Sequence, residues 1–415
     1  MPKVTPYILY AIPVFFILIG IEIFAARVKK AKVYRLNDAI TNISCGLVQQ
    51  VFAVLMRGIL LFGYLFLHEN FRLFDLDASK WWVWVVCFVG VDFCYYWFHR
   101  YAHEISVMWG GHIVHHQSEE YNLSVALRQG AFQGMFSWAF YLPLAFLGFD
   151  PVVFLVVAQF QTLYQFWIHT RLIHLMPKWF EFIFNTPSHH RVHHGINPKY
   201  IDRNHGGTLI IFDRMFGTFQ LEEEAVVYGV TKPLESWNPV WANFDYFKDV
   251  FKLITRCKNP IDMIKVLIKG PGWRPDYLGG PQFPQPITTE AFRKYDTEKS
   301  KSVGPYVLFQ YVLLLAGAST FLLFSGKIKQ NFEGWVAMMW LVGIAGLIFF
   351  STANMGALLA GKPWGNWAEW PRMALTAAVL AFFSFGTIAF IPILVGMTLL
   401  AIGSGVWLRR LNASV

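Results

Sequence analysis

Long apolar runs separated by polar loops are the feature that most limits how this chain can fold. A transmembrane helix needs about 20 mostly apolar residues. Only 15% of the residues are charged, whereas soluble domains have about 25%. We therefore predict an all-α, multi-pass integral membrane protein with about nine spans. The nine runs are Tyr7–Ala26, Cys45–Leu67, Trp81–Phe98, Ala131–Leu147, Pro151–Ile168, Val303–Phe324, Trp335–Ser351, Met373–Gly386 and Ala389–Leu408.

Positive charge predicts the orientation of these runs. Lys29, Lys30, Lys32 and Arg35 follow the first run, so the positive-inside rule places that loop in the cytosol. Counting spans from this loop returns the chain to the cytosolic side wherever a histidine group occurs. Lys327 and Lys329 are an exception to the rule, because the same count places them on the other side of the membrane. The last two runs could instead form a re-entrant hairpin.

Histidines gather at the ends of these runs with the spacing of metal ligands. On a helix, residues i, i+3 and i+4 share one face, and neutral imidazole suits iron, zinc or copper. The number of imidazoles exceeds what one metal can bind, so we predict a histidine-rich cap for two metals on the cytosolic face. The predicted ligands are His99, His103, His112, His115, His116, His169, His190, His193 and His194.

The remaining histidines carry weaker signals. His169 is an isolated histidine, included because it follows an apolar run at the depth predicted for the first histidine pair. The sequence does not decide whether His174 and His189 bind a metal. His189 could instead contact a metal ligand without binding the metal itself. His68 and His205 are predicted to have no metal role.

Two acidic residues are predicted to take part in catalysis. Asp92 lies seven residues before His99, inside an apolar run, where an ionisable group is costly and usually functional. The alternative for Asp92 is a structural hydrogen bond between helices. Asp92 and Glu104 are both candidates to fix the histidine rings. Arg128 and Lys232 are candidates for contact with a headgroup or cofactor, or with phosphates of bulk lipid.

Longer strings around the histidines resemble a known family. They include Gly90–Arg100, Tyr121–Ser124, Tyr164–Thr170, Asn185–Gly195 and Lys269–Trp273. Over roughly residues 35–275 the chain resembles the membrane fatty acid hydroxylase and sterol desaturase superfamily, and within it the alkylglycerol monooxygenases. The residues that match the family's metal ligands are His99, His103, His112, His115, His116, His190, His193 and His194.

The resemblance implies an activity, with its cofactors and partners. It implies an endoplasmic reticulum enzyme with two Fe ions that hydroxylates the alkyl carbon next to an ether oxygen, using O2 and tetrahydrobiopterin. The resulting hemiacetal falls apart to a fatty aldehyde and a glycerol derivative. Glu104 matches a glutamate that the family needs for activity. No motif of soluble pterin hydroxylases is present, so the pterin-binding residues are unknown.

The expected partners are an ether lipid substrate drawn from the bilayer, O2 and membrane lipids. No nucleic acid partner is expected, because the basic residues behind the net charge of +9 are not clustered. The site is expected to face the cytosol, from the endoplasmic reticulum membrane or from a bacterial inner membrane. The oligomeric state is left open.

Two other functions fit parts of the pattern. One is another lipid or sterol hydroxylase or desaturase of the superfamily with a different electron donor. A membrane metal transporter is less favoured, because transporters usually place ligands near the bilayer midplane.

We predict four parts along the chain: N-terminal spans at 1–80, a fatty acid hydroxylase domain with the di-iron site at 81–275, a cytosolic linker at 276–302, and C-terminal spans at 303–415. Residues 244–268 have apolar positions at helical spacing between charges. This segment could form a helix that lies flat on the lipid headgroups, or an amphipathic helix that packs on the domain.

Overall fold

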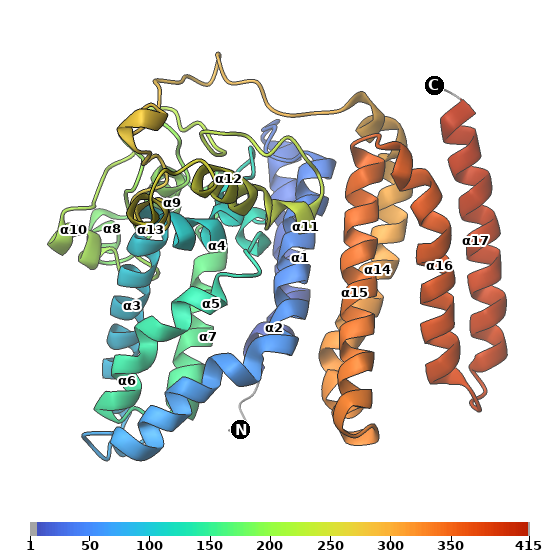
Figure 1. Cartoon of the computed structure of the whole chain (residues 1–415), viewed down its shortest axis with the longest axis horizontal. Coiled ribbons are helices and arrows are strands. Elements are labelled where there is room, and N and C mark those ends of the chain that lie inside the picture. The colour runs from blue at the N-terminus through green and yellow to red at the C-terminus, as the bar shows by residue number, and fades with distance from the viewer. Residues whose placement is uncertain (1–5, 414–415) are drawn as a thin grey trace. The chain divides into compact units, whose positions relative to one another are not determined.

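The computed structural model describes residues 6–413, and every regular element in them is a helix (Figure 1). Outside the helices there are two isolated β-bridges, Phe184–Leu209 and Gly195–Tyr228. The all-α prediction is confirmed. The chain forms two compact units. The first contains the described parts of Met1–Arg35, Met56–Leu234 and Asn243–Lys294, and the second contains Leu36–Leu55, Glu235–Ala242 and the described part of Tyr295–Val415.

Three long helices position the histidines in the first unit. They are α1 (Tyr7–Val28), α3 (Trp81–Glu104) and α7 (Pro151–Trp167), and α7 packs against both of the others. Helix α7 has a clear start, because the side chain of Asp150 accepts a hydrogen bond from the Val152 backbone at 2.7 Å and Pro151 occupies the first turn. His99 and His103 lie in the last turns of α3, and His169 follows the end of α7.

The shorter helices of the first unit follow these spans. Around α4 (Ser106–His116), Figure 1 shows α9, α12 and α13 at the same end of α3. The others are η1 (Val125–Leu127), α5 (Gly134–Ser137), η2 (Trp138–Tyr141), α6 (Leu142–Leu147), α8 (Lys178–Ile183), α9 (Pro187–His193), α10 (Ile211–Phe216), α12 (Asp245–Ile254), α13 (Pro260–Ile268) and η3 (Asp276–Leu278).

The multi-pass architecture is confirmed, and within the described residues six helices are long and apolar enough to cross a membrane. These are Tyr10–Val28, Leu36–Met56, Trp81–Glu104, Ser302–Asn331, Gly334–Leu359 and Phe390–Leu411. The structure differs from prediction at Ala131–Leu147, which is divided into α5, η2 and α6. Pro143 supplies one reason, because it has no N–H to continue a helix from the residues before it. The predicted total of nine spans stays a prediction.

The second unit is a bundle of membrane helices. It contains α14 (Glu298–Asn331), α15 (Gly334–Leu359), α16 (Pro363–Ser384) and α17 (Phe390–Ala413), each packed against the next in sequence. The first half of α2 (Leu36–Phe71) joins this bundle, where Leu47 and Val51 share an apolar cluster with Leu341 and Ala345. The short α11 (Pro239–Ala242) packs on α15.

Helices α12 and α13 show what becomes of the amphipathic segment 244–268. The Tyr246 and Ser106 hydroxyls lie 2.9 Å apart, and the Phe247 ring fills the space over Gly110, so α12 packs on α4. One face of α12 therefore packs on the domain, which was one of the two alternatives predicted for this segment. Phe251 and Ile261 are exposed on the outer side. Contact of that side with headgroups stays a prediction.

Candidate metal centre

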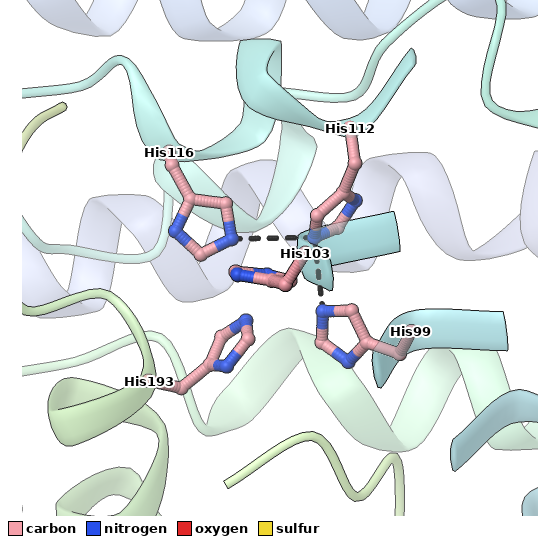
Figure 2. A group of neighbouring side chains, drawn as sticks. All are labelled: His99, His103, His112, His116 and His193. Atoms are coloured by element: carbon pink, nitrogen blue, oxygen red, sulfur yellow. Dashed lines mark hydrogen bonds between the residues drawn. The ribbon is translucent and has the colours of Figure 1, made fainter. Parts of the chain in front are cut away.

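The nine histidines predicted as ligands are buried and lie in two groups. The first histidine group contains five side chains, and the second contains four. Within each group one ring nitrogen per residue lies within 4.8 Å of all the others. The first histidine group is His99, His103, His112, His116 and His193 (Figure 2), and the second is His115, His169, His190 and His194.

Helical periodicity explains how two HxxHH sequences serve two groups. On an α-helix the residue at i+4 is rotated by about 40° from residue i, whereas the residue at i+3 is rotated by about 60° the other way, so the two can face neighbouring points. On α4, positions 112 and 116 enter the first group, and His115 enters the second. On α9 and its cap the assignment is reversed: positions 190 and 194 enter the second group, and His193 enters the first. Each of the two helices therefore contributes to both groups.

The rings of the first group are held with one nitrogen facing inward. The Nδ1 atoms of His99 and His193 donate to the backbone carbonyls of His205 and Arg203, at 2.7 and 2.9 Å. The Nδ1 of His112 lies 2.8 Å from the side-chain oxygen of Gln133. Because these oxygens can only accept, each Nδ1 carries the proton and each Nε2 presents a lone pair.

The second group is arranged in the same way. The Nδ1 atoms of His115 and His169 donate to the carbonyls of Arg128 and Gln165, at 2.8 and 2.7 Å. The Nε2 atoms of His115 and His169 are then 3.3 Å apart, and the Nε2 of His190 is 3.0 Å from that of His169. The Nε2 atoms therefore converge on one point.

These contacts test whether a metal fits. The Nε2 atoms of His99 and His112 are 2.9 Å apart, and neither carries a proton, so they cannot hydrogen-bond to each other (Figure 2). Two facing lone pairs repel unless a cation lies between them. Neighbouring ligands at a metal–nitrogen distance of about 2.0–2.1 Å stand about 3 Å apart. The Nε2 atoms of His103 and His193 are buried without a partner among the described residues. The donors of both groups therefore fit a metal ion.

Burial keeps the imidazoles in the form that binds metals. It lowers the pKa of His112 and of His169 to about 4. Burial, and after it the neighbouring histidines, also lower the pKa of other members well below the usual value, as at His116, His193 and His194. These rings are neutral at pH 7, which leaves a lone pair free for a metal.

Asp92 anchors a loop beside the first group. It is fully buried, and its carboxylate accepts hydrogen bonds from the backbone N–H groups of Thr208 and Leu209, at 2.8 and 2.7 Å, and from Gln161 at 3.1 Å. Among the described residues no histidine ring donates to it. Asp92 was a candidate to fix a histidine ring, and backbone carbonyls accept from His99 and His193 instead. The catalytic role of Asp92 stays a prediction.

Glu104, the other predicted acid, lies at the rim of the first group. It accepts a hydrogen bond from Arg100 at 2.9 Å, and its side chain is about one-third exposed. The carboxylate nearest to a ring is instead that of Asp202, whose Oδ1 lies 3.4 Å from His103 Nδ1. No spacing pattern pointed to Asp202, because its approach to His103 depends on the path of a loop. The catalytic role of Glu104 stays a prediction.

We expect Asp92→Ala to weaken metal retention by about tenfold, the lower end of the effect of residues that orient ligands. The loop that Asp92 anchors also supplies the His205 carbonyl to His99. A Cβ atom at Gly207 would lie 2.1 Å from Gln161 and 2.8 Å from Asp92, so the loop backbone approaches both side chains closely and only glycine fits there. Counting the bound metal after dialysis against a chelator measures the effect.

Asp92→Asn is the informative partner of this variant. It keeps one acceptor but turns an N–H group toward the Leu209 N–H, so we expect a smaller loss in the same direction. Asp77→Asn is a control, since this aspartate is exposed just before α3. Normal metal content and turnover in both Asp92 variants would show that Asp92 has no role at the site.

Other residues named from the sequence are not members of the two groups. His174 is exposed, and His189 is buried with its ring 5.4 Å from that of Phe219. Arg128 is only 2% exposed and donates to the Val114 carbonyl at 2.6 Å, which leaves no surface for the expected headgroup contact. Lys232 forms an ion pair with Asp249.

Comparison with known proteins agrees with this geometry. The family described as Fatty acid hydroxylase matches residues 84–218, which include all nine histidines. The chain is 43% identical to the alkylglycerol monooxygenase of Xenopus tropicalis over 315 residues, covering 75% of this chain and 70% of that protein. It belongs to the alkylglycerol monooxygenase family. The family's human member is 42% identical over 320 residues, covering 76% of this chain and 71% of that protein. No solved structure matches the chain.

Proposed function

We propose that this chain hydroxylates the alkyl carbon next to the ether oxygen of alkylglycerols, with O2 and tetrahydrobiopterin. The hemiacetal so formed breaks down to a fatty aldehyde and a glycerol derivative. One observation carries the proposal: two buried groups of converging imidazoles lie at the end of a membrane helix in a member of the alkylglycerol monooxygenase family.

We propose iron as the metal of both groups. Imidazole binds iron, zinc and copper, so the donors alone do not choose among them. The reaction makes the choice, because no acid or base in a protein can remove the hydrogen of an alkyl C–H bond as a proton. Two bound irons supply an oxidant derived from O2 that can remove it as an atom. The histidines hold the irons, and backbone carbonyls fix the inward nitrogen of each ring.

The position of the histidines suits a lipid substrate. The 18 positions from Trp81 to His99 rise about 27 Å along α3, close to the roughly 30 Å of a bilayer's hydrocarbon core. His99 therefore lies where apolar tails meet headgroups. Val85 and Val89 expose their side chains on α3 below it, in the part that faces lipid. An alkyl tail in the bilayer can place its ether bond at this depth.

We infer that the site faces the cytosol, from the endoplasmic reticulum membrane or from a bacterial inner membrane. The support is the positive charge after the first span. The division into parts at 1–80, 81–275, 276–302 and 303–415 stays part of this proposal, as do the pterin and the roles of Glu104 and Asp92.

Anaerobic purification followed by metal counting and an assay of aldehyde release from an alkylglycerol tests the function. We expect two irons per chain and no aldehyde without the pterin. Lipid hydroxylation that depends on another electron donor would point instead to a different hydroxylase of the superfamily. Metal uptake into vesicles without O2 consumption would contradict the enzyme and support a transporter.

A further inference from the structure

A further buried histidine lies against the first histidine group. His205 is in the loop between α9 and α10 and is fully buried. Its ring centroid is 5.1 Å from that of His103, and 5.7 Å from those of His99 and His193. The rings of His99 and His103 are themselves 5.4 Å apart. The ring of His193 is 4.4 Å from that of His99 and 4.8 Å from that of His103, so His205 lies against the group but farther out than its members.

The backbone holds His205 in this place. Its N–H donates to the Oδ1 of the buried Asp213 at 2.7 Å, and the next N–H, of Gly206, donates to the Oδ2 at 2.7 Å. Its carbonyl accepts from His99 at 2.7 Å. The ring is therefore carried by a loop tied both to the first group and to a buried carboxylate.

Neither ring nitrogen makes a hydrogen bond of normal geometry in the part of the chain that the structure describes, although the backbone of Asp202 lies near the ring. A neutral imidazole has one N–H donor and one acceptor nitrogen. Leaving a buried polar group unpaired costs about 1–3 kcal/mol, so this position favours a ligand that does not belong to the chain. His189 is also buried and unpaired, but its ring lies beside Phe219 and not beside either group.

The number of ligands suggests what that partner is. Five histidines already converge in the first group, and His205 is not among those whose nitrogens lie within 4.8 Å of all the others. The five histidines would hold a metal, and catalytic metal sites retain an open position for a small exchangeable ligand.

We propose that His205 hydrogen-bonds a water-sized polar ligand held at the first histidine group. This rests on the proposed two-metal function. The ligand class is water or a small anion that replaces it. His205 is in this assignment a binding residue for the exchangeable ligand, and the five histidines of the group remain the metal ligands.

Azide binding to the oxidised two-iron enzyme tests the assignment. Titration followed by absorption gives the affinity, and iron counting gives the occupancy. We expect His205→Phe to keep two irons and to bind azide about tenfold more weakly, which is about 1.4 kcal/mol. His205→Gln restores a donor and should return the affinity to within about threefold of the unmodified enzyme. His189→Phe is the matched control and should bind azide normally.

The outcomes distinguish failure of this proposal from failure of the proposed two-metal function. Unchanged azide affinity in His205→Phe, with two irons present, would overturn the role of His205. Loss of one iron would also overturn it, since His205 would then be a metal ligand itself. If His205→Phe does not fold, equal affinities in His205→Leu and His205→Gln have the same meaning. An unmodified enzyme that holds two irons but binds no azide contradicts this inference alone, whereas one without iron contradicts the proposed function.

Discussion

We expect His190→Ala to lower turnover more than about 100-fold and to reduce the iron content from two ions to one per chain. Residues that only orient a ligand cost 10–100-fold when they are removed, so loss of a ligand should cost more. His190 is central to the second group, because its Nε2 lies 3.0 Å from that of His169 and 3.3 Å from that of His194. Iron counting and aldehyde release from an alkylglycerol measure the two effects together.

His174→Ala is the control for this variant. His174 is exposed and belongs to neither group, so its replacement should leave the iron content and turnover unchanged. A chain with His190→Ala that still holds two irons and turns over normally would show that the second group is not a metal site. Loss of iron from the His174 variant would mean that iron content falls whenever the fold is disturbed, and that it does not identify metal ligands.

The histidine groups could be predicted because their spacing follows helical geometry. His112 and His116 are four residues apart, and the structure places both in the first group. The isolated His169 was predicted from its place at the end of a span, and it lies in the second group. Periodicity and span length are properties of the local sequence, so a single sequence is enough to read them.

The contacts that orient the rings could not be predicted from the sequence. His99 and His193 donate to the carbonyls of His205 and Arg203, and a carbonyl is present at every residue. Only the path of the loop selects these two. For the same reason the sequence could not show that Asp92, a candidate to fix a ring, accepts backbone N–H groups of that loop. His205 was expected to have no metal role, since an isolated histidine in a polar loop carries no spacing signal.

A buried ion pair in the second unit gives the other large expected effect. Glu369 of α16 is fully buried and accepts hydrogen bonds from Tyr306 at 2.6 Å, Asn354 at 2.5 Å and the Nε of Arg372 at 2.9 Å. Arg372 also donates to Gln310 at 2.8 Å. These residues come from α14, α15 and α16, so one carboxylate connects three helices of the bundle.

We expect Arg372→Leu to lower the free energy of unfolding by about 3–5 kcal/mol, the usual cost of leaving one member of a buried pair without its partner. Desolvation opposes a lone carboxylate in an apolar bundle, and the hydrogen bonds from Tyr306 and Asn354 offset only part of that cost. Thermal or denaturant unfolding of the purified chain in detergent measures the change. Arg409→Leu is a control, because that arginine is exposed near the end of α17.

The double variant Glu369→Leu with Arg372→Leu shows whether the loss comes from an unpaired charge. Leucine at both positions removes both charges, and replacing a whole buried pair with apolar residues is often neutral or stabilising. We expect the double variant to be more stable than either single variant. If its loss equals the sum of the two single losses, the residues act independently. The network would then stabilise the bundle through separate hydrogen bonds, and the ion pair would not be the reason for the large single effects.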